Sequence, residues 1–230
     1  MPLPTLMPPA VFVTGTDTEI GKTASSTALL HALRRRGLRA VGMKPVASGS
    51  QDLGHGLRND DALALQAASW PVPDYADLNP YALRQPLAPE LAAAEDGVQV
   101  QLAPIVAAFE RLRAQADVVV VEGVGGWLAP VSATLDQLDL VRALRLPVLL
   151  VVGMRLGCVN HARLTAQSLQ ASGVECLGWI GNHIDPTMQR QDENIVTLQQ
   201  RLPMPCWGRL PYLPGADGRT LGAHLGAEQQ

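Results

Sequence analysis

Short apolar runs rich in β-branched residues recur along the chain, and a stretch with helical spacing follows most of them. A run that is apolar at successive positions has both faces buried, as strands have in a parallel sheet covered by helices. This alternation restricts the chain to an α/β fold, with a doubly wound, mostly parallel sheet between two helical layers. The predicted strands span residues 11–14, 40–44, 118–122, 148–152 and 177–181, with a short sixth strand over 206–210.

Helical periodicity places amphipathic helices between these strands. The first helix ends at Gly37, the residue type that helices commonly use just past their last turn. The basic run Arg34, Arg35 and Arg36 falls at that end, where cations complement the helix dipole and are easily solvated. The predicted helices span residues 22–36, 104–115, 135–144, 160–171 and 187–202, and the Pro-rich residues 70–89 are expected to form an irregular crossing loop with a short helix.

The balance of charge excludes several classes of partner. The 230 residues carry 18 Lys and Arg against 21 Asp and Glu, so no general positive field is available for nucleic acid or an anionic membrane. The longest apolar run, residues 147–152, is far shorter than the roughly 20 residues that span a bilayer. We expect a single domain over residues 1–230, with residues 1–9 as an extended or disordered tail.

The cysteines indicate the redox compartment. Cys158, Cys176 and Cys206 are an odd number with long gaps and no C-x-x-C pair. This spacing argues against a disulfide framework and against a structural zinc site. The chain also begins without the basic segment of a secretory leader. We therefore expect a cytoplasmic protein with neither a membrane partner nor a nucleic-acid partner.

Residues 11–23 combine a β-branched strand, a loop with glycines, the pair Lys22-Thr23 and the start of a helix. This order is that of a P-loop, in which backbone N–H groups and a helix N-terminus hold phosphates. The lysine reaches the outer phosphate oxygens, and the threonine hydroxyl can ligate Mg²⁺. The loop is a variant, because Thr16 stands at the usual first glycine position and Gly15 comes one residue earlier. A plain turn is the alternative, but the flanking strand and helix favour a P-loop NTPase-like fold.

Four further segments fall at predicted strand ends or in the loops after them, at the same edge of the sheet. With the P-loop they read GTDTEIGKT (residues 15–23), GMKPVASG (42–49), LRNDDA (57–62), VEGVGG (121–126) and LGCVNH (156–161). In this order and with this spacing, the set closely resembles dethiobiotin synthetase, a family of the biotin pathway. The resemblance runs from about Val11 to beyond Asn182 and becomes vague toward the C-terminus.

The resemblance implies an ATP- and Mg²⁺-dependent cyclo-ligase that closes a cyclic urea on 7,8-diaminononanoate with CO₂. In this family an amine is carbamoylated, the carbamate is phosphorylated by ATP, and the second amine closes the ring. ADP and phosphate are released. The sequence leaves open whether ATP, GTP or CTP is preferred and which nitrogen is carbamoylated.

The resemblance implies that Lys44, Lys22 and Thr18 are catalytic. Lys44 ends the second predicted strand, which is expected beside the phosphate loop, and a fixed ammonium there would stabilise the charge that phosphoryl transfer builds. The alternative is a solvated lysine. Thr18 and Glu19 would reach the γ-phosphate or the substrate, although Glu19 could equally be a solvated loop acid.

The metal set implied is Thr23, Asp61 and Glu122, because Mg²⁺ prefers a few oxygen ligands completed by phosphate and water. Asp60 is the rival of Asp61, and we expect Asp60 to cap a helix that begins at Ala62. The nucleotide contacts implied by the resemblance are Thr18, Glu19, Ile20, Gly21, Lys22, Thr23, Asp61, Glu122, Asn182, Leu210 and Pro211. In this set Asn182 would bind adenine, with a plain Asx turn as its alternative.

The substrate contacts implied are of two kinds. Ser48 would bond the amine or carbamate, and Gly125 would let the backbone approach the substrate closely. Leu156, Gly157, Cys158 and Asn160 precede or open a predicted helix, whose amides suit the distal carboxylate of the substrate. In the family this segment serves the neighbouring subunit, which implies a homodimer with the active site at its interface.

Two other classes share the P-loop. An amide ligase of the cobyrinate-diamide type usually carries a glutaminase domain, which this chain is too short to contain. A nucleotide switch of the MinD or ParA type has an early signature lysine, where this sequence has Thr16-Asp17. Both remain as alternatives, separable from a cyclo-ligase by whether phosphate release depends on the diamine.

Overall fold

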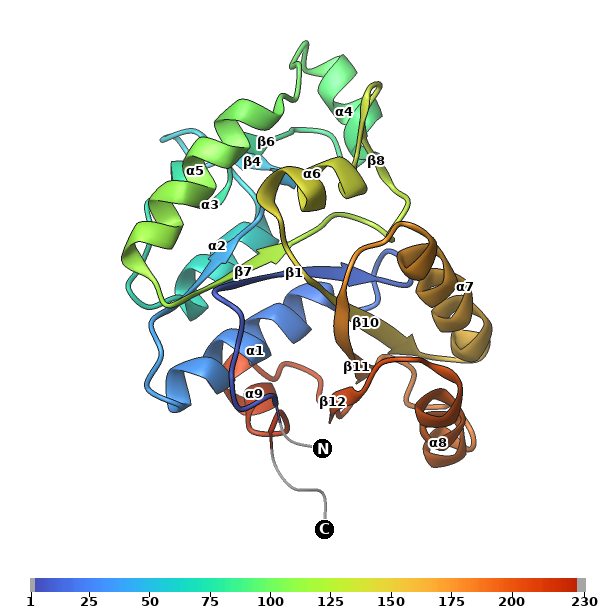
Figure 1. Cartoon of the computed structure of the whole chain (residues 1–230). Helices are drawn as coiled ribbons and strands as arrows, with labels where there is room; N and C mark the ends of the chain where they lie inside the picture. Colours follow the sequence, from blue (N-terminus) through green and yellow to red (C-terminus); the bar gives the residue numbers. More distant parts are fainter. Residues whose placement is uncertain (1–2, 227–230) are drawn as a thin grey trace.

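A computed structural model describes residues 3–226, and a six-stranded sheet lies at its centre (Figure 1). All neighbouring strands in this sheet are parallel, in the order β12-β11-β10-β1-β7-β2. The predicted doubly wound sheet is therefore confirmed. Its strands are β1 (Ala10–Gly15), β2 (Ala40–Met43), β7 (Val118–Glu122), β10 (Val148–Met154), β11 (Cys176–His183) and β12 (Cys206–Leu210).

Two layers of helices bury the faces of the sheet, which explains why the strands are apolar at successive positions. In β7, Val118 and Val120 pack into one core, while Val119 and Val121 pack into the other. Figure 1 shows α1 and α9 on one side of the sheet and α5 and α6 on the other. The first layer holds α1 (Lys22–Arg35), α2 (Asp60–Ala68), α3 (Tyr75–Leu78) and α9 (Gly218–Gly222), and the second holds α4 (Pro89–Glu95), α5 (Leu102–Gln115), α6 (Gln137–Leu144), α7 (Cys158–Ala171) and α8 (Gln191–Arg201).

Short strand pairs arrange the loops at the carboxyl edge of the sheet. The Pro-rich segment is more ordered than a crossing loop, because it contains α3 and the strand β6. Residues 51–56, which are rich in glycine, belong to a small antiparallel hairpin. The pairs are β3 (Val46–Ala47) with β6 (Tyr81–Ala82), β4 (Gln51–Asp52) with β5 (Leu57–Arg58), and β8 (Pro130–Ser132) with β9 (Leu135–Asp136).

The second strand does not pair directly with the first. Strand β7 stands between β1 and β2, with Val13 paired to Glu122 and Met43 paired to Val121. Lys44 follows Met43 directly and therefore emerges next to the carboxylate that ends β7. The reason is that the crossover from β1 to β2 skips one strand, which local patterns along the chain do not reveal.

The arginine run lies at the end of α1, with Arg35 and Arg36 exposed, and it also binds backbone carbonyls of three other segments. Arg34 donates to the carbonyl of Ala68 at 2.8 Å, and Arg35 donates to that of Gly222. Arg36 donates to the carbonyls of residues 4 and 5 and so holds the N-terminal segment. Of the predicted tail, residues 1 and 2 lie outside the described residues, as do residues 227–230 of the C-terminal segment.

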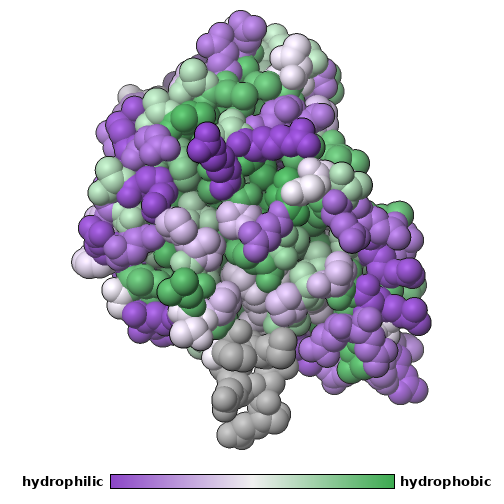
Figure 2. Space-filling model, viewed as in Figure 1, coloured by the Kyte–Doolittle hydropathy of each residue, from purple (hydrophilic) through white to green (hydrophobic). Residues whose placement is uncertain are grey.

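The outer helices turn polar sides to solvent. Figure 2 shows hydrophilic residues gathered over α7 and α8 on the face of the molecule seen there. Between residues 3 and 226, none of the helices combines the length and the apolar character that crossing a bilayer requires.

Candidate active site

The phosphate loop joins β1 to α1 and depends on a glycine at its end. Gly21 has a φ of 79°, and a Cβ placed there would lie 2.0 Å from Nδ2 of Asn182. Only glycine meets both the conformation and the space. Glu19 also has a positive φ, 58°, so the loop is held in a conformation that L side chains rarely adopt.

Lys22 opens α1 and bends back over the loop. Its Nζ donates to the carbonyl of Asp17 at 3.0 Å. Burial, with the like charge of Lys44, lowers the pKa of Lys22 to about 8. An ammonium that has lost much of its water and has only one bonded partner in the described chain is suited to an anionic ligand such as phosphate.

Lys44 lies between two carboxylates. Its Nζ donates to Oε1 of Glu122 at 2.6 Å, to Oδ2 of Asp61 at 3.0 Å and to the carbonyl of Gly123 at 3.2 Å. Burial alone would lower the pKa of Lys44, but the charges of Glu122 and Asp61 outweigh it, and the pKa is raised. In turn, the charge of Lys44 and its hydrogen bond lower the pKa of Asp61, although burial opposes the change. Lys44 is therefore a fixed cation at neutral pH.

Glu122 is fully buried and connects Lys44 to the phosphate loop. Its Oε1 accepts a second hydrogen bond, from Oγ1 of Thr23 at 2.8 Å. Its other oxygen, Oε2, has no hydrogen-bond partner in the part of the chain that the structure describes. A buried carboxylate oxygen without a donor is costly in an apolar interior, so a cation beside it would be favoured.

Asp61 is presented by the first turn of α2. The cap of this helix is Asn59, whose side chain accepts a hydrogen bond from the backbone N–H of Ala62. The prediction that Asp60 caps a helix beginning at Ala62 is therefore wrong, because the helix begins at Asp60 itself. The earlier start places Asp61 in the first turn, where its carboxylate reaches Lys44.

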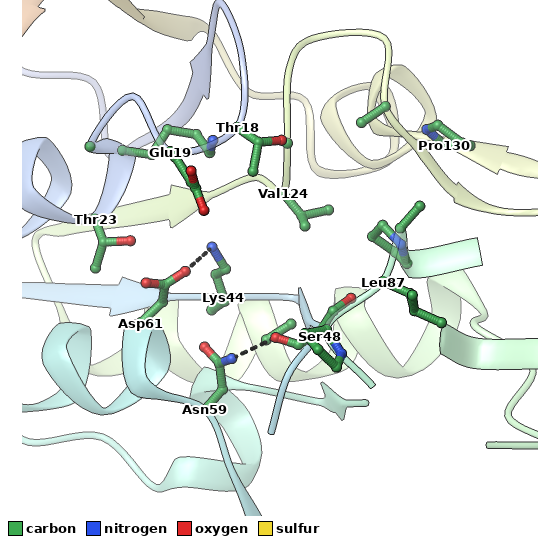
Figure 3. A pocket seen from close by; sticks show the side chains of 18 residues that line it. Thr18, Glu19, Thr23, Lys44, Ser48, Asn59, Asp61, Leu87, Val124 and Pro130 are labelled. Carbon is green, nitrogen blue, oxygen red and sulfur yellow. Dashed lines mark hydrogen bonds and ion pairs between the residues drawn. The ribbon is translucent and has the colours of Figure 1, made fainter. Parts of the chain in front are cut away.

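These groups surround one cavity of about 740 Å³, called here the phosphate-loop cavity. Figure 3 shows Thr18 and Glu19 on one side, Asn59 and Ser48 on the opposite side, and Lys44 between them. A third side is formed by the 86–89 segment. The lining residues are Thr18, Glu19, Gly21, Lys22, Thr23, Lys44, Ala47, Ser48, Asn59, Asp61, Pro86, Leu87, Ala88, Pro89, Val124, Gly125, Ala129 and Pro130.

The structure brings most of the predicted site residues together in this cavity. Those that line it are Thr18, Glu19, Gly21, Lys22, Thr23, Lys44, Ser48, Asp61 and Gly125. Glu122 lies buried beside it, bonded to Lys44 and Thr23. Ile20 is also buried, and its side chain packs against Gly15 and Gly153. Ile20 therefore anchors the loop to the ends of β1 and β10 rather than lining the cavity.

The residues predicted to contact the base lie elsewhere. Asn182 is buried and donates from Nδ2 to the carbonyl of Ile20 at 2.9 Å, so its side chain supports the phosphate loop. Leu210 is fully buried in the core. Pro211 lines a separate cavity of about 490 Å³ together with His183 and Tyr212.

The predicted carboxylate segment lies outside the phosphate-loop cavity of its own chain. Leu156 is 92% exposed, Gly157 and Asn160 are exposed, and Cys158 is buried at the start of α7. Gly157 precedes the helix with a φ of 93°. An exposed leucine at the start of a helix is suited to contact a second molecule.

The structure adds residues that the sequence reasoning missed. Asn59 lines the cavity and donates to the carbonyl of Ser48 at 3.0 Å, which joins two loops of the site. The 86–89 segment with Val124 and Pro130 forms an apolar wall. Backbone hydrogen bonds from Gly49 to Gln85 and from Ser50 to Leu83 tie this wall to the Ser48 loop. The clustered prolines of the sequence indicated a rigid loop, but they did not indicate that this loop lies against the cavity.

Sequence comparisons place the chain among named enzymes. It is 71% identical over 212 residues to the ATP-dependent dethiobiotin synthetase BioD of Xanthomonas axonopodis pv. citri, covering 92% of this chain and 95% of the relative. It is 66% identical over 217 residues to that of Xanthomonas campestris pv. campestris, covering 94% and 97% of the two chains. For that of Xylella fastidiosa the identity is 62%, with 94% and 96% covered. A family model described as an AAA domain matches residues 9–220.

Solved structures that resemble the chain support the fold alone. The MinC:MinD cell division protein complex of Aquifex aeolicus matches with a TM-score of 0.58 at 14% identity, covering 90% of this chain and 82% of the other. The cell division protein FtsY of Thermotoga maritima matches with a TM-score of 0.53 at 17% identity, covering 98% and 70%. At these identities the likeness to MinD carries no function to this chain.

Proposed function

The chain belongs to the dethiobiotin synthetase family, the ATP-dependent ligases of biotin biosynthesis, and on that premise we propose that its reaction takes place in the phosphate-loop cavity. One observation carries the proposal. Two lysine ammonium groups, those of Lys22 and Lys44, and the oxygens of Thr23, Asp61 and Glu122 converge on one side of this cavity. Such a cluster suits a triphosphate and a neighbouring anion formed during the reaction.

The reaction proposed has three steps. One amine nitrogen of 7,8-diaminononanoate bonds to the carbon of CO₂ and loses a proton, forming a carbamate. A carbamate oxygen then attacks the γ-phosphorus of ATP, and ADP leaves. In the third step the second amine nitrogen attacks the carbamate carbon and loses a proton, phosphate leaves, and the cyclic urea is closed.

Lys44 and Lys22 stabilise the negative charge of these steps. The ammonium of Lys44 is held by three acceptors, so it needs no reorganisation when charge develops beside it. Lys22 exchanges its single backbone acceptor for phosphate oxygens when a nucleotide enters. Lys44 depends on two other residues, because Asp61 and Glu122 set its position.

Ser48, Thr18 and Glu19 orient the substrates. Oγ of Ser48 is buried with no hydrogen-bond partner among the described residues, and it is free to bond the amine or the carbamate. Thr18 and Glu19 reach into the cavity from the phosphate loop, opposite Ser48 (Figure 3). The reacting groups would thus be held between the two loops, which raises the rate by proximity.

The apolar wall suits the hydrocarbon part of the diamine. Leu87 and Pro130 lie on the side of the cavity away from Lys44, and Val124 lies between Thr18 and Ser48 (Figure 3). An alkyl chain placed there loses contact with water, at about 0.8 kcal/mol for each buried methylene. The wall therefore fixes which end of the substrate meets Lys44.

Replacing Leu87 by aspartate is expected to raise the KM for the diamine by about tenfold while leaving the KM for ATP unchanged, because a carboxylate would oppose an alkyl chain at the wall. Leu87 is 40% exposed, so the substitution does not disturb the core. Steady-state kinetics with each substrate varied separately measures both constants. Leu213 is similarly exposed and lies away from the cavity, so Leu213→Asp serves as the matched control. Equal KM values for the two variants would contradict the assignment.

Mg²⁺ fits the oxygen groups beside the phosphate loop. The hydroxyl of Thr23, the carboxylate of Asp61 and Oε2 of Glu122, which lacks a donor, are hard oxygen ligands of the kind that this ion prefers. No group of three or more His, Cys, Asp or Glu side chains within residues 3–226 could hold a metal unaided. Phosphate oxygens and water would complete the coordination, and the bound ion would neutralise charge on the transferred phosphoryl group.

Replacing Thr23 by valine is expected to weaken Mg²⁺-dependent nucleotide binding by about tenfold while the fold persists. Valine keeps the shape of threonine but removes the hydroxyl that donates to Glu122. Titrating a fluorescent ATP analogue across a series of Mg²⁺ concentrations measures the change. Thr27 stands one turn later, and among the residues that the structure describes its hydroxyl bonds only the backbone carbonyls of Thr23 and Ala24, so Thr27→Val is the control. An unchanged Mg²⁺ dependence in Thr23→Val would refute the metal assignment.

The remaining assignments complete the proposal. Asn182, Leu210 and Pro211 hold the base, Leu210 through its backbone because its side chain is buried in the core. Leu156, Gly157, Cys158 and Asn160 bind the substrate carboxylate in the neighbouring subunit of a homodimer. The exposure of Leu156 and Asn160 outside the cavity of their own chain supports that arrangement. We also place the enzyme in the cytoplasm, in keeping with its three free cysteines.

Phosphate release with ATP, GTP or CTP, each with and without diaminononanoate and bicarbonate, tests the proposed function. We expect release to require the diamine and to accompany dethiobiotin formation. Release that proceeds equally without the diamine would instead favour a nucleotide switch. Sedimentation of the full chain, with and without substrates, tests the dimer.

A further inference from the structure

A charged side chain that is distant in sequence, at the end of the strand next to β1, reaches the phosphate loop. Arg155 follows β10, and its guanidinium donates to Oδ2 of Asp17 at 2.6 Å. The two side chains are 42% and 46% exposed. Arg155 is not among the described residues that line the phosphate-loop cavity, so it is not placed to touch a ligand there.

Asp17 makes several of the contacts that hold the loop together. Its Oδ1 accepts a hydrogen bond from the backbone N–H of Thr18 at 2.8 Å, and its carbonyl accepts Nζ of Lys22 at 3.0 Å. A Cβ added to Gly126 would lie 3.7 Å from both Cα and N of Asp17, so the glycine loop after β7 approaches it closely. Movement of Asp17 would thus move Thr18 and break the hydrogen bond from Nζ of Lys22 to the Asp17 carbonyl.

We propose that Arg155 is a positioning residue for the reaction, which holds the phosphate loop in its binding conformation by fixing the carboxylate of Asp17. This inference rests on the proposed placement of the triphosphate at that loop. The conformation needs support because Glu19, two residues after Asp17, has a positive φ of 58°. A loop held open before the nucleotide arrives binds it without a further ordering cost.

The pair acts on the loop rather than on global stability. An ion pair between half-exposed side chains contributes little to the free energy of unfolding, because water and salt screen it. The loop has its own backbone bond, from Thr16 to the carbonyl of Val151 at 3.1 Å, so it stays attached to the sheet without Arg155. The backbone carbonyl of Arg155, which accepts the N–H of Cys158 at 3.0 Å, is also kept by any substitution.

Arg155→Gln in the full-length chain tests the inference. We expect the KM and the dissociation constant for ATP to rise about fivefold with kcat nearly unchanged and the melting temperature within about 2 °C of wild type. Arg155→Lys should recover most of the affinity, because a lysine restores the charge. Arg190, the exposed residue just before α8, pairs with Glu193 of that helix at 2.9 Å, so Arg190→Gln is the matched control and should leave both constants unchanged.

Asp17→Asn and the double variant separate positioning from direct contact with the nucleotide. If Arg155 acts through Asp17, both single variants lose affinity and the double variant loses no more than the worse of them. Additive losses, or an Arg155→Gln variant that binds ATP as tightly as Arg190→Gln does, would overturn the inference. If instead the proposed function were wrong, the wild-type enzyme would release no phosphate in response to the diamine.

Discussion

Replacing Lys44 by alanine is expected to abolish dethiobiotin formation while nucleotide binding survives. The ammonium of Lys44 is fixed by Glu122, Asp61 and the carbonyl of Gly123, beside the cavity where the carbamate would form. Removing one preorganised stabilising group of this kind costs about 3 kcal/mol or more in the transition state, a rate loss of a hundredfold or greater. The ATP contacts proposed through Lys22 and the loop amides are made by other groups than the Lys44 side chain.

Two measurements on Lys44→Ala separate chemistry from binding. Product formation with saturating diamine, bicarbonate and ATP should fall by about a hundredfold or more. The affinity for a fluorescent ATP analogue should change by less than about threefold. Lys22→Ala is the matched comparison, since it should lose nucleotide affinity first. Turnover of Lys44→Ala within a few-fold of wild type would mean that Lys44 is structural.

Replacing Glu122 by leucine is expected to destabilise the protein by about 3 kcal/mol, because it leaves a buried ammonium without its nearest counter-ion. Lys44 is 3% exposed and Glu122 is fully buried, so solvent cannot take over the interaction. The exposed partner Asp61 compensates only in part, since its side chain is 47% accessible to water. The Thr23 hydroxyl loses its acceptor as well.

The double variant Lys44→Met with Glu122→Leu makes this prediction specific. Removing both charges leaves an apolar pair of similar volume, which is often as stable as the ion pair it replaces. We therefore expect the urea midpoint to return most of the way to the wild-type value while activity stays absent. A double variant no more stable than Glu122→Leu would contradict the account, as would a single variant with a wild-type midpoint. Together these results would show that the pair is kept for the reaction rather than for stability.

The parallel sheet and the phosphate loop were predictable because their signals are local. The strands over residues 118–122 and 206–210 begin and end where the patterns placed them, since runs such as residues 118–121 are apolar on both faces. The start of α1 at Lys22 followed from the glycine before it. The cap of α2 was missed because Asn59 and Asp60 are both good capping residues, and only the fold shows which of them is used.

The apolar wall was not predictable from the chain. Leu87 and the prolines around it carry no periodicity, and backbone bonds to the Ser48 loop determine where they lie. The ion pair of Arg155 with Asp17 was missed for a similar reason, as its two residues are 138 positions apart. An exposed arginine at the end of a strand has no partner that sequence spacing can identify.

By itself the sequence determined the fold class, the phosphate loop and the family resemblance, because hydrophobic periodicity and glycine placement act over a few neighbouring residues. Only the tertiary structure decided that β7 stands between β1 and β2, which sets Lys44 against Glu122 across 78 positions of chain. That contact arises from the order in which strands pair, and pairing order is selected by packing of the whole core rather than by any local pattern. The position of the Lys44 ammonium is therefore a property of the assembled sheet.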